Sequence, residues 1–171
     1  HSGAAHLYDH PRNVPDALLQ KLAQSGGVIQ INSLSGYLRD LDTDAARLPE
    51  FIGLYRKYQN MPGGMRENHQ AFIAERRALD AKYPPDYADF SDVMAHIFHA
   101  LEMMGPDHVG IGLDWDGGGG VNGLQDVSDL PKITAALQDA AVADQTIEKI
   151  WSGNLLRLLR LAEAASARQS D

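Results

Sequence analysis

Two short apolar runs, VIQIN at residues 28–32 and HVGIGL at residues 108–113, constrain the fold of this chain more than any other feature. Each run has the length and composition of a buried strand, and a segment with helical spacing of apolar residues comes before it. Further helix-type segments follow the second run, between residues 130 and 165. Strands that alternate with helices are typical of a parallel sheet. The sequence therefore predicts an α/β fold.

The number of predicted strands indicates that the sheet is part of a larger domain. Two strands cannot close into a parallel sheet with helices around it, and the chain begins at His1 without a methionine. We therefore expect residues 1–171 to be the C-terminal portion of a single (β/α)8 TIM-type barrel domain. In this interpretation the N-terminal strands of the barrel are missing from the chain, and His1 ends an earlier strand.

Residues 38–88 depart from the alternation of strands and helices. Helical periods cover residues 49–58 and 65–82, with NMPGG between them and two prolines after them. We expect a helical insert at 38–88, and long excursions of this kind are often lids or rims of active sites.

Composition excludes several classes of function. The net charge of −8 argues against a nucleic-acid partner, which would favour a basic surface. No apolar run approaches the roughly 20 residues of a membrane-spanning helix, so none is expected in this chain. Because the chain has no cysteine, only His, Asp and Glu remain as candidate metal ligands.

The ends of barrel strands are where catalytic residues lie, and two candidates follow from this rule. His1 at a strand end could be a zinc ligand, although position alone favours an ordinary surface histidine. Asp114 comes directly after the second strand and could bind metal, move a proton or pair with a substrate ammonium. A loop cap is about equally compatible with an aspartate at this position.

Arg12 precedes a helix start at Asn13 and suits a substrate carboxylate, because the helix N-terminus adds positive potential. A solvated arginine paired with Asp9 or Asp16 is at least as compatible with the sequence. The other histidines and the glycine run give weaker signals. His96 and His99 are expected to be structural, His6 and His10 to belong to a loop or rim, and the glycines of 117–120 to form a flexible turn and not a nucleotide site.

Five stretches carry a resemblance to a known family: HSGAAHLYDHPRNVPDALL, GGVIQIN, MAHIFHALEMMGPDHVGIGLDWDG, GLQDVSDLP and GNLLRLL. In this order and spacing they resemble the C-terminal part of the renal (membrane) dipeptidase family of zinc peptidases. The match covers nearly the whole chain except residues 38–88. The resemblance implies an amidohydrolase-like barrel that holds two zinc ions.

Four residues match functional positions of that family. His1 matches the last of its zinc-binding histidines, and Arg12 matches the arginine that grips the C-terminal carboxylate of the substrate. Asp114 matches an aspartate that contacts the amino end of the substrate and is the candidate for proton transfer. Tyr37 falls where the family has a tyrosine at the rim of the site. The other zinc ligands of the family are absent from this chain.

The resemblance predicts a zinc-dependent dipeptidase that is complete only with the missing N-terminal part, so the chain alone is expected to be inactive. The alternative is a degenerate homologue that keeps the barrel as a binding or structural module. Retention of His1, Arg12 and Asp114 together favours the enzyme. The sequence leaves open whether the protein is a homodimer and whether it is extracytoplasmic (periplasmic or secreted) or cytoplasmic.

Overall fold

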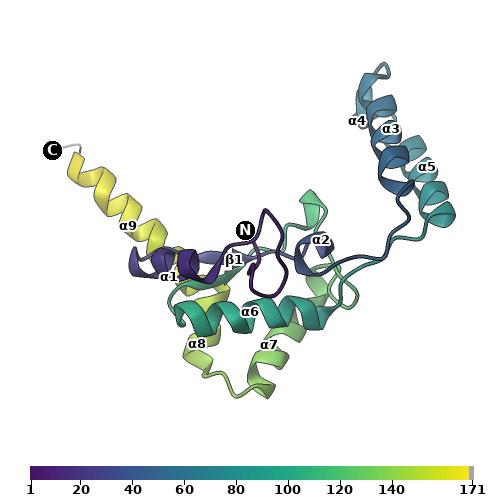
Figure 1. Ribbon diagram of the computed structural model, residues 1–171. Helices are drawn as coiled ribbons and strands as arrows, with labels where there is room; N and C mark the ends of the chain where they lie inside the picture. Colours follow the sequence, from purple (N-terminus) through teal and green to yellow (C-terminus); the bar gives the residue numbers. More distant parts are fainter. Residues whose placement is uncertain (170–171) are drawn as a thin grey trace. The chain divides into compact units, whose positions relative to one another are not determined.

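The computed structural model describes residues 1–169 and has a mixed α/β, mostly helical architecture (Figure 1). The chain divides into two compact units. One is made of residues 1–40 together with residues 87 onward, and the other is Leu41–Asp86. The first unit contains the strands and every residue to which the sequence analysis assigned a function.

The sheet consists of two parallel strands, β1 (Ile29–Ile31) and β2 (Val109–Ile111), in which Ile31 lies opposite Ile111. The predicted parallel pairing is therefore confirmed. Ser2 also pairs with Ile31 in the parallel sense, through hydrogen bonds from Ser2 N to Gln30 O and from Asn32 N to Ser2 O. The segment that follows His1 thus lies along the edge of β1.

The first unit contains several helices, and all but the last of them contribute side chains to one apolar core. They are α1 (Asp16–Gln24), α2 (Ser35–Leu38), α6 (Phe90–Met104), α7 (Leu130–Asp139), α8 (Asp144–Glu148) and α9 (Asn154–Gln169), with a π-helical turn at Lys149–Gly153 and 3₁₀ turns at Trp115–Gly117 and Val127–Asp129. Helix α6 packs against both strands and against α1. Ile31, Ile97 and Val109 are fully buried where these elements meet.

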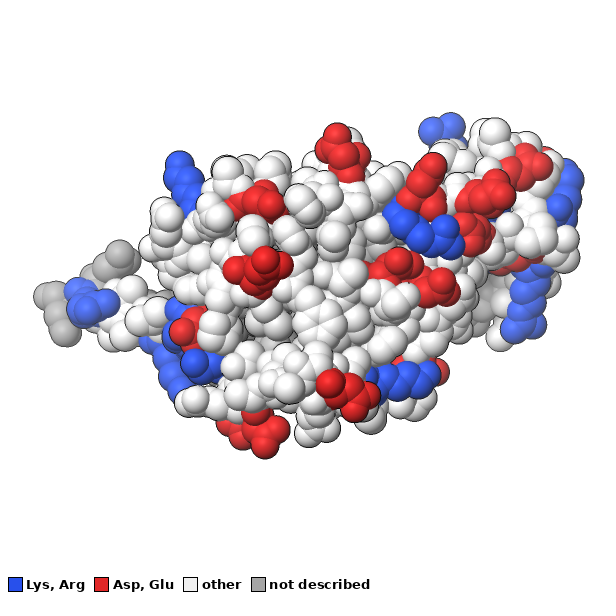
Figure 2. Space-filling model, turned by 60° about the horizontal axis from the view of Figure 1, so that its bottom comes forward, with Lys and Arg blue, Asp and Glu red and all other residues white. Residues whose placement is uncertain are grey.

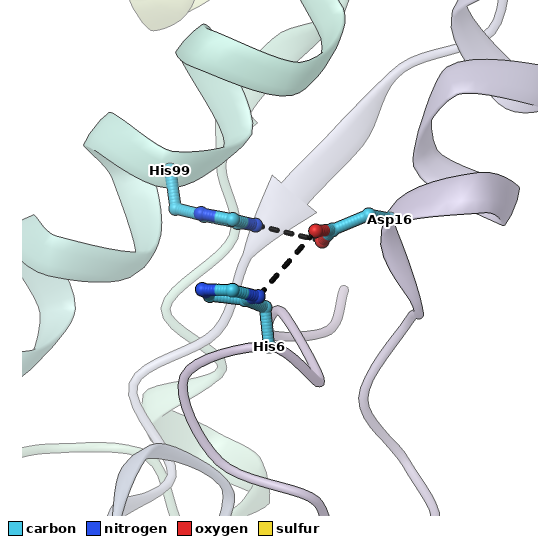
Figure 3. Close-up of side chains that lie close together, drawn as sticks. All are labelled: His6, Asp16 and His99. Carbon is cyan, nitrogen blue, oxygen red and sulfur yellow. Dashed lines mark hydrogen bonds and ion pairs between the residues drawn. The ribbon is translucent and has the colours of Figure 1, made fainter.

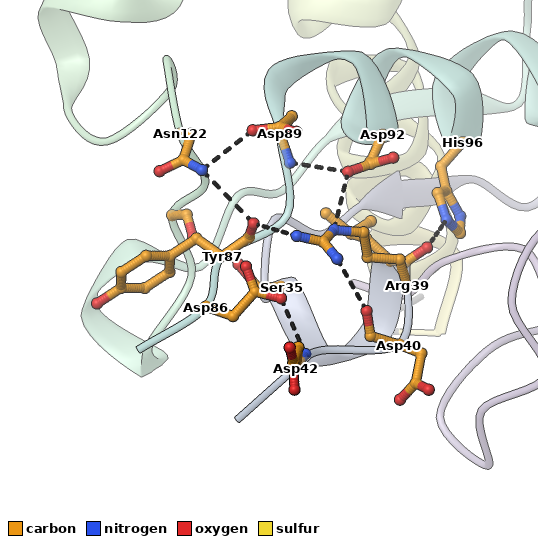
Figure 4. Close-up of polar contacts among 12 residues, drawn as sticks. Ser35, Arg39, Asp40, Asp42, Asp86, Tyr87, Asp89, Asp92, His96 and Asn122 are labelled. Carbon is orange, nitrogen blue, oxygen red and sulfur yellow. Dashed lines mark hydrogen bonds and ion pairs between the residues drawn. The ribbon is translucent and has the colours of Figure 1, made fainter. Parts of the chain in front are cut away.

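The helix α6 begins and ends where its sequence dictates. Asp89 and Asp92 form a reciprocal capping box at its start, and Gly105 ends it with a φ of +80°. Arg39 links the start of α6 to residues 40 and 87, where the chain leaves and re-enters the first unit. Its guanidinium donates to the carbonyl oxygens of Asp40 and Tyr87 and lies 3.6 Å from the Asp92 carboxylate (Figure 4). The two points at which the chain leaves and re-enters the unit are therefore held together.

The second unit is a small helical assembly of α3 (Arg47–Asn60), α4 (Gly64–Glu67) and α5 (His69–Lys82). Its helices fall in the two regions where the sequence has helical periods, and α3 packs against α5. Lys57 binds Glu75 and Lys82 binds Glu50, and these ion pairs lower the pKa of both carboxyl groups. Both glutamates are thus engaged in holding the helices together.

The surface is rich in acidic residues. On the face in Figure 2 the lysines and arginines are interspersed with acidic residues and do not gather into a continuous patch. Among residues 1–169, no helix is both long and apolar enough to cross a membrane.

Candidate functional site

The strand ends bring His1 and Asp114 together. Nε2 of His1 lies 3.1 Å from Oδ2 of Asp114, and both side chains remain partly exposed, at 45% and 34%. His1 precedes Ser2, which pairs with one side of β1, and Asp114 follows β2, which pairs with the other side. The parallel arrangement brings these segments, 113 positions apart in the chain, to the same end of the sheet. The two strand-end candidates of the sequence analysis therefore lie next to each other.

A glycine directly after β2 makes room for His1. Side chains alternate between the faces of a strand, so Gln30 and Asn32 share one face of β1, and Gly112 lies on the matching face beside β2. A Cβ on Gly112 would lie 2.8 Å from Cβ of Gln30 and 3.3 Å from Cβ of His1. The glycine therefore allows the histidine to lie over the end of the sheet.

The backbone of Asp114 is held in an unusual conformation. Its φ is +59°, in the left-handed region that few residues other than glycine adopt, and its carbonyl accepts hydrogen bonds from the N–H groups of Gly117 and Gly119. Glycine is required at position 119, because a Cβ there would lie 2.0 Å from the carbonyl oxygen of Leu113. The strained turn positions the Asp114 carboxylate beside His1, and backbone strain of this kind often accompanies function.

The carboxylate of Asp114 is not used as a helix cap. It makes no capping hydrogen bond to the 3₁₀ turn that follows, so the loop-cap interpretation does not hold for this side chain. The glycine run beyond it forms a turn that is hydrogen-bonded to the segment after β1, since Gly120 N donates to Ser33 O at 2.9 Å and Ser33 Oγ donates to Leu113 O at 2.6 Å. The turn is thus tied down at both ends.

Arg12 and Tyr37 form the second pair. Nη1 of Arg12 donates to the Tyr37 hydroxyl at 3.1 Å, and the guanidinium carbon lies 5.2 Å from the centre of the ring. Among the described residues, Arg12 forms no ion pair with Asp9 or Asp16, which was the alternative that the sequence left open. Its other guanidinium donors face no acceptor from the described part of the chain.

Two residues that the sequence analysis did not assign to the site support the Arg12–Tyr37 pair. His10 packs on the Tyr37 ring at 4.6 Å, and its Nδ1 accepts a hydrogen bond from the backbone N–H of Arg12. Buried Asn13 accepts from Gly3 N and donates to the carbonyl oxygens of Tyr8 and Tyr37. Asn13 therefore fastens the loop that carries Arg12 to the helix that carries Tyr37.

His96 plays a similar part from α6. Its Nδ1 accepts from Ala4 N at 2.9 Å, which leaves Nε2 as the donor to Leu38 O at 3.3 Å. Burial lowers the pKa of His96, so the ring stays neutral and can accept and donate at once. The structure thus agrees with the expected structural role of this histidine. The signal that could have indicated it is its position on the buried face of a strongly amphipathic helix.

Asn32 is a further polar residue at the strand ends. It is fully buried directly after β1, its Oδ1 accepts from Leu34 N, and its Nδ2 has no partner among the described residues. A buried donor without an acceptor lowers the stability of the fold. We therefore expect the Asn32 amide to bind an acceptor that the described residues do not supply.

Comparisons with known proteins identify relatives of this chain. The family model for membrane dipeptidase (peptidase family M19) matches residues 1–171. Dipeptidase tcpJ of Claviceps purpurea is 29% identical over 170 residues, which are 99% of this chain and 30% of that protein.

Two solved structures have a similar fold. The probable dipeptidase PvdM from Pseudomonas aeruginosa is 29% identical, with a TM-score of 0.64 over 92% of this chain and 42% of that one. A metallopeptidase from Rhodobacter sphaeroides, crystallised with a phosphinate mimic of the dipeptide L-Ala-D-Ala, is 24% identical with a TM-score of 0.61, over 94% of this chain and 34% of that one.

The chain spans about a third of the length of these proteins. The match nevertheless includes every strand end described above, because it extends over all 171 residues. The chain therefore belongs to the membrane dipeptidase family, peptidase family M19.

Proposed function

We propose that this chain is the C-terminal portion of a (β/α)8 barrel and that the complete protein is a zinc-dependent dipeptidase. One observation carries the proposal: the imidazole of His1 and the carboxylate of Asp114 meet at 3.1 Å at the ends of parallel strands. In the proposed enzyme His1 is a metal ligand and Asp114 a proton-transfer group, as the family resemblance implies, and both lie at the catalytic end of the barrel.

An apolar groove supports the presence of further barrel strands. The groove has a volume of about 300 Å³ beside β1 and is lined by His1, Val14, Leu22, Val28, Ile29, Gln30, Leu155 and Leu158. Because Ser2 pairs with Ile31 in the parallel sense, a strand that ends at His1 would run back along Ile29 and into this groove. Such a strand would cover apolar surface that otherwise faces water.

The donor set fits zinc. An imidazole nitrogen such as that of His1 is a common zinc ligand, and the Asp114 carboxylate lies 3.1 Å from it, beside the place where His1 would hold the ion. His1 is the proposed ligand from this chain, and the proposed N-terminal part supplies the others for two ions. When bound, zinc polarises the scissile carbonyl and lowers the pKa of water enough to make it a nucleophile.

The residues of this chain have separate tasks in the hydrolysis. Arg12 binds the C-terminal carboxylate of the substrate with the guanidinium donors that Tyr37 leaves free, and Tyr37 fixes the plane of the guanidinium. Asp114 accepts a proton from the attacking water and delivers it to the leaving amine. A carboxylate held by Arg12 one residue from the scissile bond restricts the leaving group to a single residue with a free carboxylate, as in a dipeptide.

The proposed function is tested with the complete protein and three matched peptides: a dipeptide, the same dipeptide with a C-terminal amide, and a tripeptide. We expect zinc-dependent hydrolysis of the free dipeptide, with kcat/KM lower by at least tenfold for the other two. Chelation should abolish the activity, and added zinc should restore it.

Two variants provide the control. His1→Ala should lose the activity and about one zinc per chain, whereas His69→Ala, which removes a histidine from the Leu41–Asp86 unit, should change neither. A folded complete protein that binds dipeptides without hydrolysing any of them in the presence of zinc would contradict the proposal and favour the degenerate homologue.

A further inference from the structure

Three residues with no assigned function meet in the first unit. His6 lies in the loop behind His1, Asp16 in the first turn of α1, and His99 on α6. Nε2 of His99 is 2.7 Å from Oδ1 of Asp16, and Nδ1 of His6 is 3.6 Å from Oδ2 of the same carboxylate. Figure 3 shows both imidazoles turned toward that carboxylate from the same side.

The two imidazoles are arranged as a pair. Their rings are stacked with centres 4.7 Å apart and planes 8° from parallel, so one nitrogen of each ring points the same way. These two nitrogens and a carboxylate oxygen lie within 4.8 Å of one another. Small side-chain rotations bring such atoms to the separation of about 3.3 Å that a tetrahedral zinc ion requires.

The ligand types and the surroundings favour zinc over a hard cation. Calcium and magnesium prefer six or more oxygen ligands, whereas two imidazoles and one carboxylate suit zinc. An open cavity of about 320 Å³ adjoins the cluster and is lined by Ala5, His6, Asp9, Pro15 and Asp16. It leaves room for a water molecule or the Asp9 carboxylate as a fourth ligand.

A hydrogen bond alone accounts for only part of this arrangement. His99 is largely buried, with 11% of its side chain exposed, and its bond to Asp16 needs no further partner. His6 is 63% exposed, yet its ring lies flat on His99 and presents Nδ1 to the same carboxylate. A cation between the three groups explains why the exposed His6 side chain adopts this position. Coordination requires that the nitrogen of each ring that faces the ion be unprotonated.

We propose that His6, Asp16 and His99 form a zinc site that shares no residue with the His1–Asp114 pair. Because its ligands come from a loop, α1 and α6, the bound ion fastens the loop between His1 and Arg12 to two packed helices. The site is therefore a structural clamp on the segment that carries the substrate-binding arginine.

The test is a zinc titration of the complete protein against a chromophoric chelator, with wild type and His6→Ala compared. We expect His6→Ala to bind about one zinc fewer per chain, or to bind that zinc at least about 100-fold more weakly, since loss of a ligand exceeds the 10- to 100-fold effect of an outer partner. His6 is exposed in a loop, so its removal leaves the core intact. His99→Gln should lower the zinc content in the same way.

His69→Ala serves as the matched control and should bind as much zinc as wild type. Cobalt substitution gives an independent readout, because the visible bands of the bound ion should weaken in His6→Ala and not in His69→Ala. Equal zinc content and affinity in wild type and His6→Ala would overturn the proposal. Dipeptidase activity of the same preparations shows separately whether the catalytic proposal holds.

Discussion

Asp114→Asn should lower kcat of the complete enzyme by roughly 10²- to 10⁴-fold, the usual contribution of a general acid–base group. The amide keeps the size and the backbone turn of the aspartate but cannot accept a proton at neutral pH. Because the proton moves only as the bond breaks, the loss should fall on kcat more than on KM. Steady-state kinetics with one dipeptide measure both constants.

Zinc analysis of the same variant separates two roles of Asp114. A proton-transfer group should leave the zinc content nearly intact, whereas loss of about one zinc per chain would make Asp114 an essential ligand. Asp116→Asn is the matched control, because Asp116 is exposed in the same turn and should be replaceable. Wild-type turnover in Asp114→Asn, together with loss of turnover in Asp116→Asn, would show that the wrong aspartate had been assigned.

Arg12→Met should mainly raise KM, by about 30- to 700-fold, which corresponds to the roughly 2–4 kcal/mol expected for a desolvated charge pair. The methionine keeps the apolar stem over the Tyr37 ring and removes the charge. The substrate carboxylate is charged both before and during the reaction. Removal of the Arg12 charge therefore weakens substrate binding, which raises KM, more than it lowers kcat.

The amidated dipeptide provides the control for Arg12. If the guanidinium binds the substrate carboxylate, Arg12→Met should have little effect on hydrolysis of the amide, which has no charge to lose. Tyr37→Phe removes only the 3.1 Å hydrogen bond and should cost about 0.5–1.5 kcal/mol in kcat/KM. An equal effect of Arg12→Met on both substrates would contradict the assigned role.

The sequence predicts the sheet and the helix α6 because their signals are local. A buried strand and an amphipathic helix with a glycine stop each show a periodicity within about 15 residues. The convergence of His1 and Asp114 follows from the same signals, since residues at the ends of adjacent parallel strands must lie at one edge. Their strand-end positions left several roles open, and the family resemblance chose among those roles.

The cluster of His6, Asp16 and His99 could not be predicted in this way. Ten residues separate His6 from Asp16, and 83 separate Asp16 from His99. Their meeting depends on how α1 packs against α6, which no local pattern encodes. The same reason applies to His96, whose partners Ala4 and Leu38 lie far away in the chain. The left-handed backbone of Asp114 was also unexpected, because it depends on the close approach of Gly119 to Leu113.

The most direct test of the account is anomalous X-ray diffraction at the zinc edge from crystals of the active, complete protein. We expect an anomalous peak at roughly 2.0–2.1 Å from an imidazole nitrogen of His1, beside the Asp114 carboxylate. An active protein whose crystals show zinc elsewhere and none at His1 would contradict the assignment of this strand end as the catalytic metal site.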